Sequence, residues 1–208
     1  MDGRKRARAS SNNLVVSLSD REISAEIIES CRQGDRDAFR TLYEAYKDKV
    51  YSISLYFFHG DAATASDVTQ QVFLKLITGI GQFRGDSEFS TWLYRLVINA
   101  CVDGARRDKS RALVGERTNL EAIAAPVSHE HALARAQIAH SVQTAVSALP
   151  AKFRLPILLR YFEDLSYEEM AKALNCSMGT VASRLSRGHR MLSEKLAVLR
   201  GPGATKRQ

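Results

Sequence analysis

Apolar residues recur at intervals of three and four along most of this chain, and that spacing limits its fold more than any other feature. Such a period places the apolar side chains on one face of an α-helix. Runs of β-branched residues with strict alternation, which would indicate half-buried strands, do not occur, and the 208 residues include only four prolines. The sequence therefore predicts an all-α protein.

The period predicts four helices in the N-terminal half of the chain. Glycines separate them: Gly34 and Gly60 follow the first two helices, and three glycines lie between residues 79 and 85, ahead of the last helix. Glycine ends helices because it adopts the left-handed backbone conformation without steric cost. The predicted helices span about residues 20–33, 37–59 and 90–107, and the third helix begins at 61 or 64 and ends at about 78.

Between Asp108 and His131 the helical period breaks. A linker of this length is uncommon inside a compact domain, so the break predicts two small helical domains joined by a flexible linker. Helical pattern returns at about residues 133–149, 152–163, 167–174 and 178–198. The expected organisation is a basic flexible arm (1–19), a first helical domain (20–107), the linker (108–131), a second helical domain (132–200) and a flexible tail (201–208).

Composition excludes several classes of protein. The apolar stretches are too short to span a bilayer and no apolar block follows the basic start, so we expect a cytoplasmic chain. The three cysteines lie far apart without a Cys-x-x-Cys pair, which disfavours disulfides and zinc sites. The five histidines form no ligand motif, and neither a phosphate-binding glycine loop nor a nucleophile motif occurs. We therefore expect neither catalysis, nor a metal, nor a cofactor.

The net charge of +7 is unevenly distributed. Residues 20–76 carry seven basic and ten acidic side chains, whereas residues 77–208 carry 19 basic and 12 acidic side chains. The basic excess suggests a polyanion partner for the later part of the chain and a different partner for the earlier part.

The segment from Leu165 to Val181 carries the strongest local signal. Ser166 followed by Glu169 is a capping box, which fixes the start of a short helix. Asn175 tolerates the left-handed backbone of a tight turn, and Ser177 can cap the next helix. This helix–turn–helix pattern is typical of DNA-binding domains, whose second helix enters the major groove. The alternative is an ordinary helical hairpin with a solvated basic face.

The outward residues of that second helix suit duplex DNA. Hydroxyls and helix-end amides suit phosphates, and arginines suit guanine edges. Between residues 178 and 208, seven basic residues accompany a single acidic one. The candidate DNA-binding residues are Ser177, Met178, Gly179, Thr180, Ser183, Arg184 and Arg187.

Two sets of motifs resemble bacterial sigma factors of the extracytoplasmic-function (ECF) group, and they follow the family's order over most of residues 37–196. The motifs similar to sigma region 4 are Ala148-Leu149-Pro150, Leu158 to Glu169, and Gly179-Thr180-Val181-Ala182-Ser183-Arg184-Leu185. The motifs similar to sigma region 2 are Ala38-Phe39 with Leu42, Tyr43 and Tyr46; Asp67 to Leu74; Phe83 to Arg95; and Asn99, Asp103, Arg106 and Arg107.

The resemblance implies a protein that binds core RNA polymerase, directs it to promoters and promotes DNA opening. The first domain would dock on the clamp of the largest polymerase subunit and read the −10 element as single-stranded DNA. The second would read the −35 element as duplex. The flap of the second-largest subunit and an anti-sigma factor are further implied partners. The implied polymerase-binding residues are Asp67, Gln70, Gln71 and Phe73. The implied −10 residues are Phe83, Arg84, Ser87, Trp92, Asn99, Arg106 and Arg107.

Several of these residues have a plainer interpretation. Phe73 fits core packing as well as it fits a partner contact, and Trp92, the single tryptophan, is more typical of a core anchor. The chain also departs from the family pattern: Ser66 and Gln71 replace usually acidic residues, and Ile98 and Ala182 replace usually basic ones. A stand-alone helix–turn–helix regulator is the competing class, but it would have no reason to carry the segment around Trp92.

Overall fold

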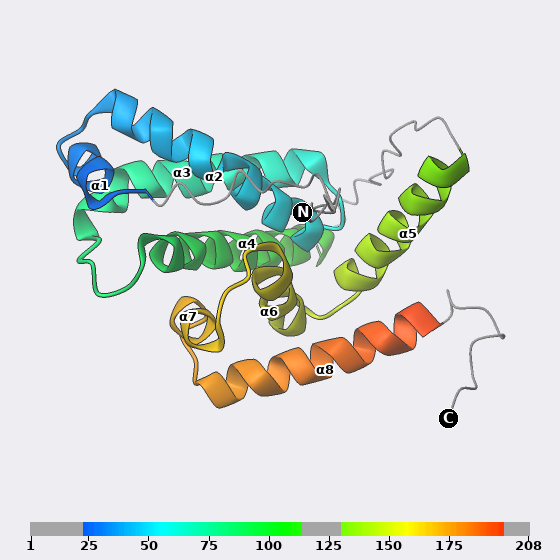
Figure 1. The fold of residues 1–208 in the computed structure, drawn as a ribbon. Coiled ribbons are helices and arrows are strands. Elements are labelled where there is room, and N and C mark those ends of the chain that lie inside the picture. Colours follow the sequence, from blue (N-terminus) through cyan, green and yellow to red (C-terminus); the bar gives the residue numbers. More distant parts are fainter. Residues whose placement is uncertain (1–22, 114–129, 198–208) are drawn as a thin grey trace, which may run out of the picture.

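The structure is a computed structural model that describes residues 23–113 and 130–197, and within these ranges every regular element is helical. The all-α prediction is therefore confirmed. Figure 1 shows α1 to α4 on one side and α6 to α8 on the other. The elements are α1 (Ala25–Arg32), α2 (Arg36–Phe57), α3 (Ala62–Gly79), the 3-10 turn η1 (Ile80–Gln82), α4 (Phe89–Leu113), α5 (Glu130–Ser147), α6 (Ala151–Phe162), α7 (Tyr167–Ala173) and α8 (Met178–Ala197).

Two Gly-Asp pairs make the turns between the first three helices. Gly34 and Gly60 both have φ of +86°, a left-handed conformation that lets the chain reverse without steric cost. The aspartate after each glycine caps the next helix: Oδ1 of Asp35 accepts the backbone N–H of Asp37, and Oδ1 of Asp61 accepts that of Ala63. These local signals explain why the predicted bounds of α2 and α3 agree with the observed ones to within about two residues.

The core of the first domain follows the predicted apolar stripes. Helix α2 packs on α3, and α3 packs on α4. Leu42, Val50 and Ile53 of the predicted α2 stripe are fully buried. The helical period also places Tyr43 with the apolar residues of the predicted helix at 37–59. In the structure Tyr43 lies at the edge of the buried face and is exposed, with its ring 4.8 Å from that of Phe73.

The second domain is organised around α6. Phe153 to Leu159 of this helix are all buried, because α8 covers one side of it and α2 the other. Gly188 lets α8 approach closely: a Cβ atom there would lie 3.1 Å from Cγ1 of Ile157. Val181 and Leu185 are buried as the period predicts.

The predicted linker is too long at both ends. Helix α4 continues to Leu113 and α5 already begins at Glu130, so residues 108–113 and 130–131 are helical. Neither stretch continues an apolar stripe. Residues 108–113 include lysine, arginine, alanine and leucine, and Glu130 begins α5 just before Ala132, Leu133, Ala134 and Arg135; the intrinsic helix propensity of these residues carries each helix beyond its packed part. The rest of the predicted linker, the predicted arm and the predicted tail lie outside the described residues.

The two domains pack against each other. Helix α6 contacts α2, and α7 contacts α4, so buried residues of both domains belong to one apolar cluster. Figure 1 shows α6 and α7 between α4 and α8. Within the described ranges, none of the helices combines the length and the apolar character that crossing a membrane requires.

Gly104 tests the packing of the first domain. A Cβ atom at Gly104 would lie 2.7 Å from Cζ of Phe58. Replacing Gly104 with valine is therefore expected to lower the free energy of unfolding by about 1–3 kcal/mol, the usual cost of overpacking. Urea unfolding followed by circular dichroism measures the change. Gly81→Val is the matched control, because a Cβ at Gly81 has no neighbour within 4 Å. Equal unfolding midpoints for the two variants would contradict the packing described here.

Candidate functional site

The outer face of α3 presents two of the four residues predicted to bind polymerase. Asp67 and Gln70 are exposed. Phe73 is 7% exposed and packs edge-on against Tyr43, so its side chain belongs to the core, the plainer of the two interpretations. The sequence analysis missed Leu74, which is 63% exposed on this face although it is apolar. Ile77, three residues on, is 50% exposed as well, and two adjoining apolar side chains beside polar ones suit a protein partner.

Gln71 connects the face of α3 to α4. It is half-buried, and its side-chain oxygen accepts a hydrogen bond of 3.0 Å from Nη2 of Arg107. Nearby, Lys75 of α3 lies 3.9 Å from Asp103 of α4, which also pairs with Arg106 at 3.7 Å. All of these side chains are at least partly exposed, so the pairs position the groups more than they stabilise the fold. The predicted polymerase-binding and −10 residues therefore meet at one edge.

Aromatic rings fix the base of the loop between η1 and α4. The rings of Phe83, Phe89 and Trp92 lie 5.5–5.8 Å apart in pairs, and Phe83 is buried. Arg32 of α1 donates a hydrogen bond to the carbonyl of Phe83. Phe83 is thus a support for the loop rather than an exposed stacking platform, and Trp92 is half-buried beside it.

This support holds the polar part of the loop outward. Arg84 is exposed, Ser87 is half-buried, and Gly85 turns the chain with φ of +78°. Beyond the loop, α4 carries an exposed row at helical spacing that consists of Arg95, Asn99, Asp103, Arg106 and Arg107. Arg95 was missed by the sequence analysis, although it lies four residues before Asn99 and therefore on the same face.

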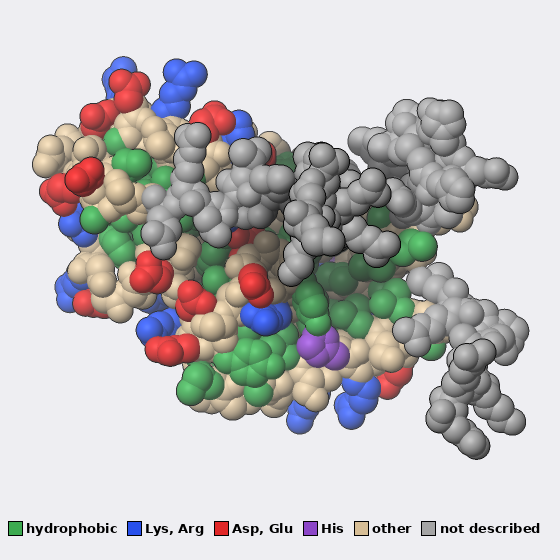
Figure 2. All heavy atoms as spheres, viewed as in Figure 1, with side chains coloured by type: hydrophobic (Ala, Val, Ile, Leu, Met, Phe, Trp, Pro, Cys, Tyr) green, Lys and Arg blue, Asp and Glu red, His purple; other side chains and the backbone are tan. Residues whose placement is uncertain are grey.

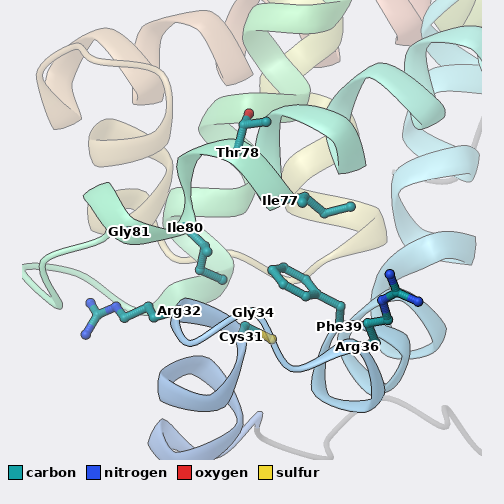
Figure 3. Close-up of a pocket in the computed structure, with 9 residues that line it drawn as sticks. All are labelled: Cys31, Arg32, Gly34, Arg36, Phe39, Ile77, Thr78, Ile80 and Gly81. Carbon is teal, nitrogen blue, oxygen red and sulfur yellow. The ribbon is translucent and has the colours of Figure 1, made fainter.

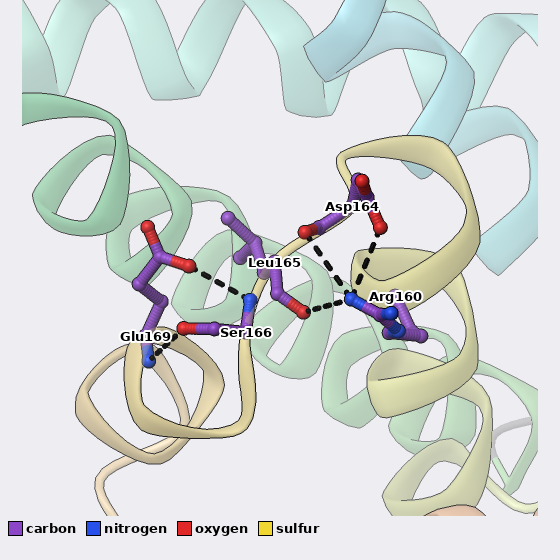
Figure 4. Close-up of polar contacts among 5 residues, drawn as sticks. All are labelled: Arg160, Asp164, Leu165, Ser166 and Glu169. Carbon is purple, nitrogen blue, oxygen red and sulfur yellow. Dashed lines mark hydrogen bonds and ion pairs between the residues drawn. The ribbon is translucent and has the colours of Figure 1, made fainter.

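The helix–turn–helix begins at the predicted capping box. Figure 4 shows Oγ of Ser166 accepting the N–H of Glu169 at 3.2 Å, while the Glu169 carboxylate accepts the N–H of Ser166 at 2.7 Å. Arg160 holds the two residues that precede Ser166. Its Nη1 lies 3.0 Å from the carbonyl oxygen of Leu165 and 3.0 Å from the carboxylate of Asp164. Asp164 has φ of +49°, so these contacts stabilise a strained turn that orients α7 relative to α6.

The turn before α8 also forms as predicted. Asn175 has φ of +49°, and Oγ of Ser177 accepts the N–H of Thr180 at 3.2 Å. Five of the seven predicted DNA-binding residues are exposed, and two, Thr180 and Arg184, are half-buried. Nη1 of Arg184 lies 3.8 Å from the sulfur of Cys176, so this arginine folds back over the turn. The exposed residues are Ser177, Met178, Gly179, Ser183 and Arg187.

Helices α6 and α7 expose an aromatic group near α8. Tyr161, Phe162 and Tyr167 are all exposed, and the Tyr161 hydroxyl lies 3.1 Å from Nε2 of His189. Figure 2 shows hydrophobic side chains gathered over this part of the molecule, with charged side chains of both signs around them. The helical period did not reveal this group, because its members lie off the buried faces.

A separate cleft of about 580 Å³ lies between α1, the start of α2 and the end of α3. Figure 3 shows Phe39, Ile77 and Ile80 in the cleft, with Arg32 and Arg36 on opposite sides. Cys31 is buried at its wall, and burial raises the pKa of its thiol, so this cysteine is a poor nucleophile. Among the described residues, no three His, Cys, Asp or Glu side chains lie close enough to hold a metal ion.

Comparison with known proteins identifies both domains. Residues 42–111 match Sigma-70 region 2, and residues 139–192 match Sigma-70 region 4. The RNA polymerase sigma-H factor of Pseudomonas aeruginosa is 35% identical over 186 residues, which cover 86% of this chain and 96% of that protein. The chain therefore belongs to the ECF sigma factors. Sigma regions 2 and 4 take part in polymerase binding and promoter recognition, so the protein is a transcription initiation factor.

Other relatives agree with this assignment. ECF sigma factor SigW of Bacillus subtilis is 32% identical, covering 81% of this chain and 94% of SigW. The ECF sigma-E factor of Escherichia coli is 32% identical, covering 88% of this chain and 98% of that protein. The fold is similar to that of the sigma factor RpoE in complex with the anti-sigma factor NepR from Bartonella quintana, with a TM-score of 0.64, 22% identity, and coverage of 77% and 97%. CnrH in complex with the cytosolic domain of CnrY gives a TM-score of 0.62, with 21% identity and coverage of 86% and 99%.

A substitution in the capping box tests how the start of α7 is stabilised in the DNA-binding domain of this sigma factor. Ser166→Ala removes the acceptor for the Glu169 N–H and is expected to lower the free energy of unfolding by about 1 kcal/mol. Ser186→Ala, an exposed substitution within α8, is the matched control. Denaturant titration of both variants measures the difference. A Ser166→Ala variant as stable as the control would show that the box does not fix the start of α7.

Proposed function

We propose that the exposed face of α3 docks on the clamp of the largest subunit of core RNA polymerase. Asp67 and Gln70 offer polar contacts there and Leu74 offers an apolar one, the combination typical of a protein interface. The exposure of these three residues beside the buried Phe73 supports this assignment. Gln71 serves the same surface indirectly, since it is bonded to Arg107.

The loop before α4 and the exposed row of α4 read the −10 element as single-stranded DNA. Unstacked bases bind where a basic surface adjoins aromatic rings. Arg84, Arg95, Asn99 and Arg106 provide polar contacts, and the accessible part of Trp92 provides a ring. Ser87 lies in the same loop, and Phe83 supports it from below. The neighbouring polymerase-binding face would present this surface to DNA as the polymerase opens the duplex.

The helix–turn–helix reads the −35 element as duplex. The exposed start of α8 presents hydroxyls, backbone amides and Arg187, which suit phosphates and base edges in the major groove. The half-buried Arg184 would have to leave Cys176 to reach a base. The same domain contacts the polymerase flap; Ile138 and Val142 on α5 are exposed apolar side chains available for that contact.

An anti-sigma factor regulates this protein, and the working compartment is the cytoplasm. Two proteins of the same fold, RpoE and CnrH, have structures in complex with NepR and with the cytosolic domain of CnrY. The observation that carries the whole proposal is the order of the two matched regions, each of which has its own exposed binding surface. No step of this function requires catalysis by the chain.

The α3 face is tested by replacing Gln70 and Leu74 together with alanine. The double variant is expected to bind core polymerase about 30-fold to 1000-fold more weakly, because two central interface side chains that contribute about 1–2 kcal/mol each together contribute about 2–4 kcal/mol. Fluorescence anisotropy with labelled sigma factor measures the affinity in the absence of DNA. The control replaces Glu168 and Lys172 of α7, an exposed pair 3.1 Å apart whose removal leaves the net charge unchanged. Unchanged affinity in the Gln70/Leu74 variant would show that core polymerase docks on another surface of the protein.

The start of α8 is tested by Arg187→Ala. Loss of one arginine contact to DNA is expected to weaken binding of the reconstituted holoenzyme to duplex −35 DNA by about fivefold to a hundredfold. Binding to core polymerase should be unaffected. Lys195→Ala, an exposed cation in the last turn of the same helix, controls for the loss of charge. Equal loss in both variants would show general electrostatic attraction rather than a contact at the start of α8.

A further inference from the structure

Two polar contacts join α3 to α4, which Figure 1 shows side by side. Oε1 of Gln71 on α3 accepts a hydrogen bond of 3.0 Å from Nη2 of Arg107 on α4. One turn further along α3, Nζ of Lys75 lies 3.9 Å from Oδ2 of Asp103, which is one turn before Arg107. The contacts are thus successive rungs between antiparallel helices. Because these side chains are exposed or half-buried, the rungs stabilise the fold little and act on where each side chain points.

The two rungs differ in charge. The carboxylate of Asp103 faces two cations, because it lies 3.7 Å from Nη1 of Arg106 as well as 3.9 Å from Lys75. Arg107 is held by an uncharged amide instead, and no carboxylate among the described residues pairs with it. Asp108, the next residue, points about 100° away around the helix. The charge of Arg106 is therefore partly compensated, whereas that of Arg107 is available to a further partner.

The amide at position 71 sets this arrangement. The resemblance leads us to expect an acidic residue at Gln71, and a carboxylate there would hold Arg107 but also cancel its charge toward any third group. An amide holds the guanidinium through one N–H and cancels none of its charge. Because arginine only donates hydrogen bonds, the amide must present its oxygen. The Gln71 side chain therefore faces α4 and not a partner docked on α3.

Arg107 lies at the far end of the exposed row on α4 from the loop that precedes this helix. The helix rises about 22 Å between Trp92 and Arg107, a length of about six base pairs at 3.4 Å each. A strand bound along the row, with unstacked bases at Trp92, therefore passes Arg107 about six nucleotides away. A guanidinium with free N–H groups suits a phosphate, which it can bind through two parallel hydrogen bonds.

We propose that Gln71 is a positioning residue that holds Arg107 for a contact with a backbone phosphate of the −10 strand, and that its uncharged amide leaves the whole charge of Arg107 to that phosphate. The inference rests on the proposed function, because it takes the exposed row of α4 as the surface that meets the strand. It assigns Gln71 to DNA binding, although the resemblance implies a polymerase contact, and it makes Arg107 a stronger source of electrostatic attraction than Arg106.

Three substitutions in the full-length chain separate the positioning of Arg107 from its charge. Gln71→Met keeps the length of the side chain and removes the acceptor, whereas Gln71→Glu keeps an acceptor and adds a negative charge. Arg107→Ala removes the cation itself. Each variant is reconstituted with core polymerase. Binding is measured over a range of salt concentrations on a promoter fragment that the wild-type holoenzyme selects from random DNA, with the −10 element held open by mismatches.

The dependence of DNA binding on salt distinguishes the variants. Arg107→Ala is expected to reduce the slope of log K against log salt by about 0.7, which corresponds to one lost phosphate contact on a single strand. Gln71→Glu should reduce the slope by a similar amount, because its carboxylate competes with the phosphate. Gln71→Met should leave the slope unchanged and weaken binding about threefold to tenfold, since a charged but mobile arginine must be immobilised on binding.

A double-mutant cycle and two further variants are the controls. In an Arg107→Ala background, neither substitution of Gln71 should weaken DNA binding further, which a general loss of stability would not reproduce. Gln33→Glu adds the same charge at an exposed position just after α1 and should not change the slope. Arg106→Ala should reduce the slope less than Arg107→Ala does. Fluorescence anisotropy without DNA should show at most a minor change in core affinity for Gln71→Met.

The outcomes that overturn the inference are distinct from failure of the proposed function. A loss of core affinity in Gln71→Met as large as its loss of DNA affinity would make Gln71 a polymerase contact. An effect of Gln71→Met that persists in the Arg107→Ala background would also overturn the inference. If Arg95→Ala weakens binding to the open promoter and Arg107→Ala does not, the inference fails and the function stands. If neither weakens binding, the row on α4 does not meet the strand, and the proposed reading of the −10 element fails as well.

Discussion

The geometry of the second domain depends on the buried guanidinium of Arg154. Helix α5 ends at Ser147, and Arg154 donates hydrogen bonds to the carbonyls of Ser147 and Leu149 at this helix end. Their bonds to Arg154 fix the angle between α5 and α6. Helix α8 then packs on α6 through Gly188, and α7 is oriented from the end of α6 by Arg160. The position of the recognition helix thus follows from one side chain far from the DNA surface.

The parts of the structure that could be predicted from the sequence are those that local signals determine. Helices and their starts rest on local signals, and these were readable: the aspartates after Gly34 and Gly60, and the capping box at Ser166. The predicted linker was too long because the intrinsic helix propensity of the residues at its ends extends α4 and α5 beyond their apolar stripes. The resemblance placed Phe73 and Phe83 on binding surfaces, yet both are buried. A motif identifies the residues that a family shares, but it does not show whether their side chains face the core or a partner.

The arrangement of the two domains could not be predicted, because it depends on contacts between residues far apart in sequence. Glu163 and Tyr94 are 69 positions apart, and Arg154 and Phe57 are 97 apart. One signal was nevertheless available. The predicted helix at 152–163 reads Phe-Arg-Leu-Pro-Ile-Leu-Leu in its middle, which is apolar around the whole helix except at Arg154. A helix of that kind must be covered on all sides. Within the second domain, α8 covers one side of α6; the other side is covered by α2 of the first domain.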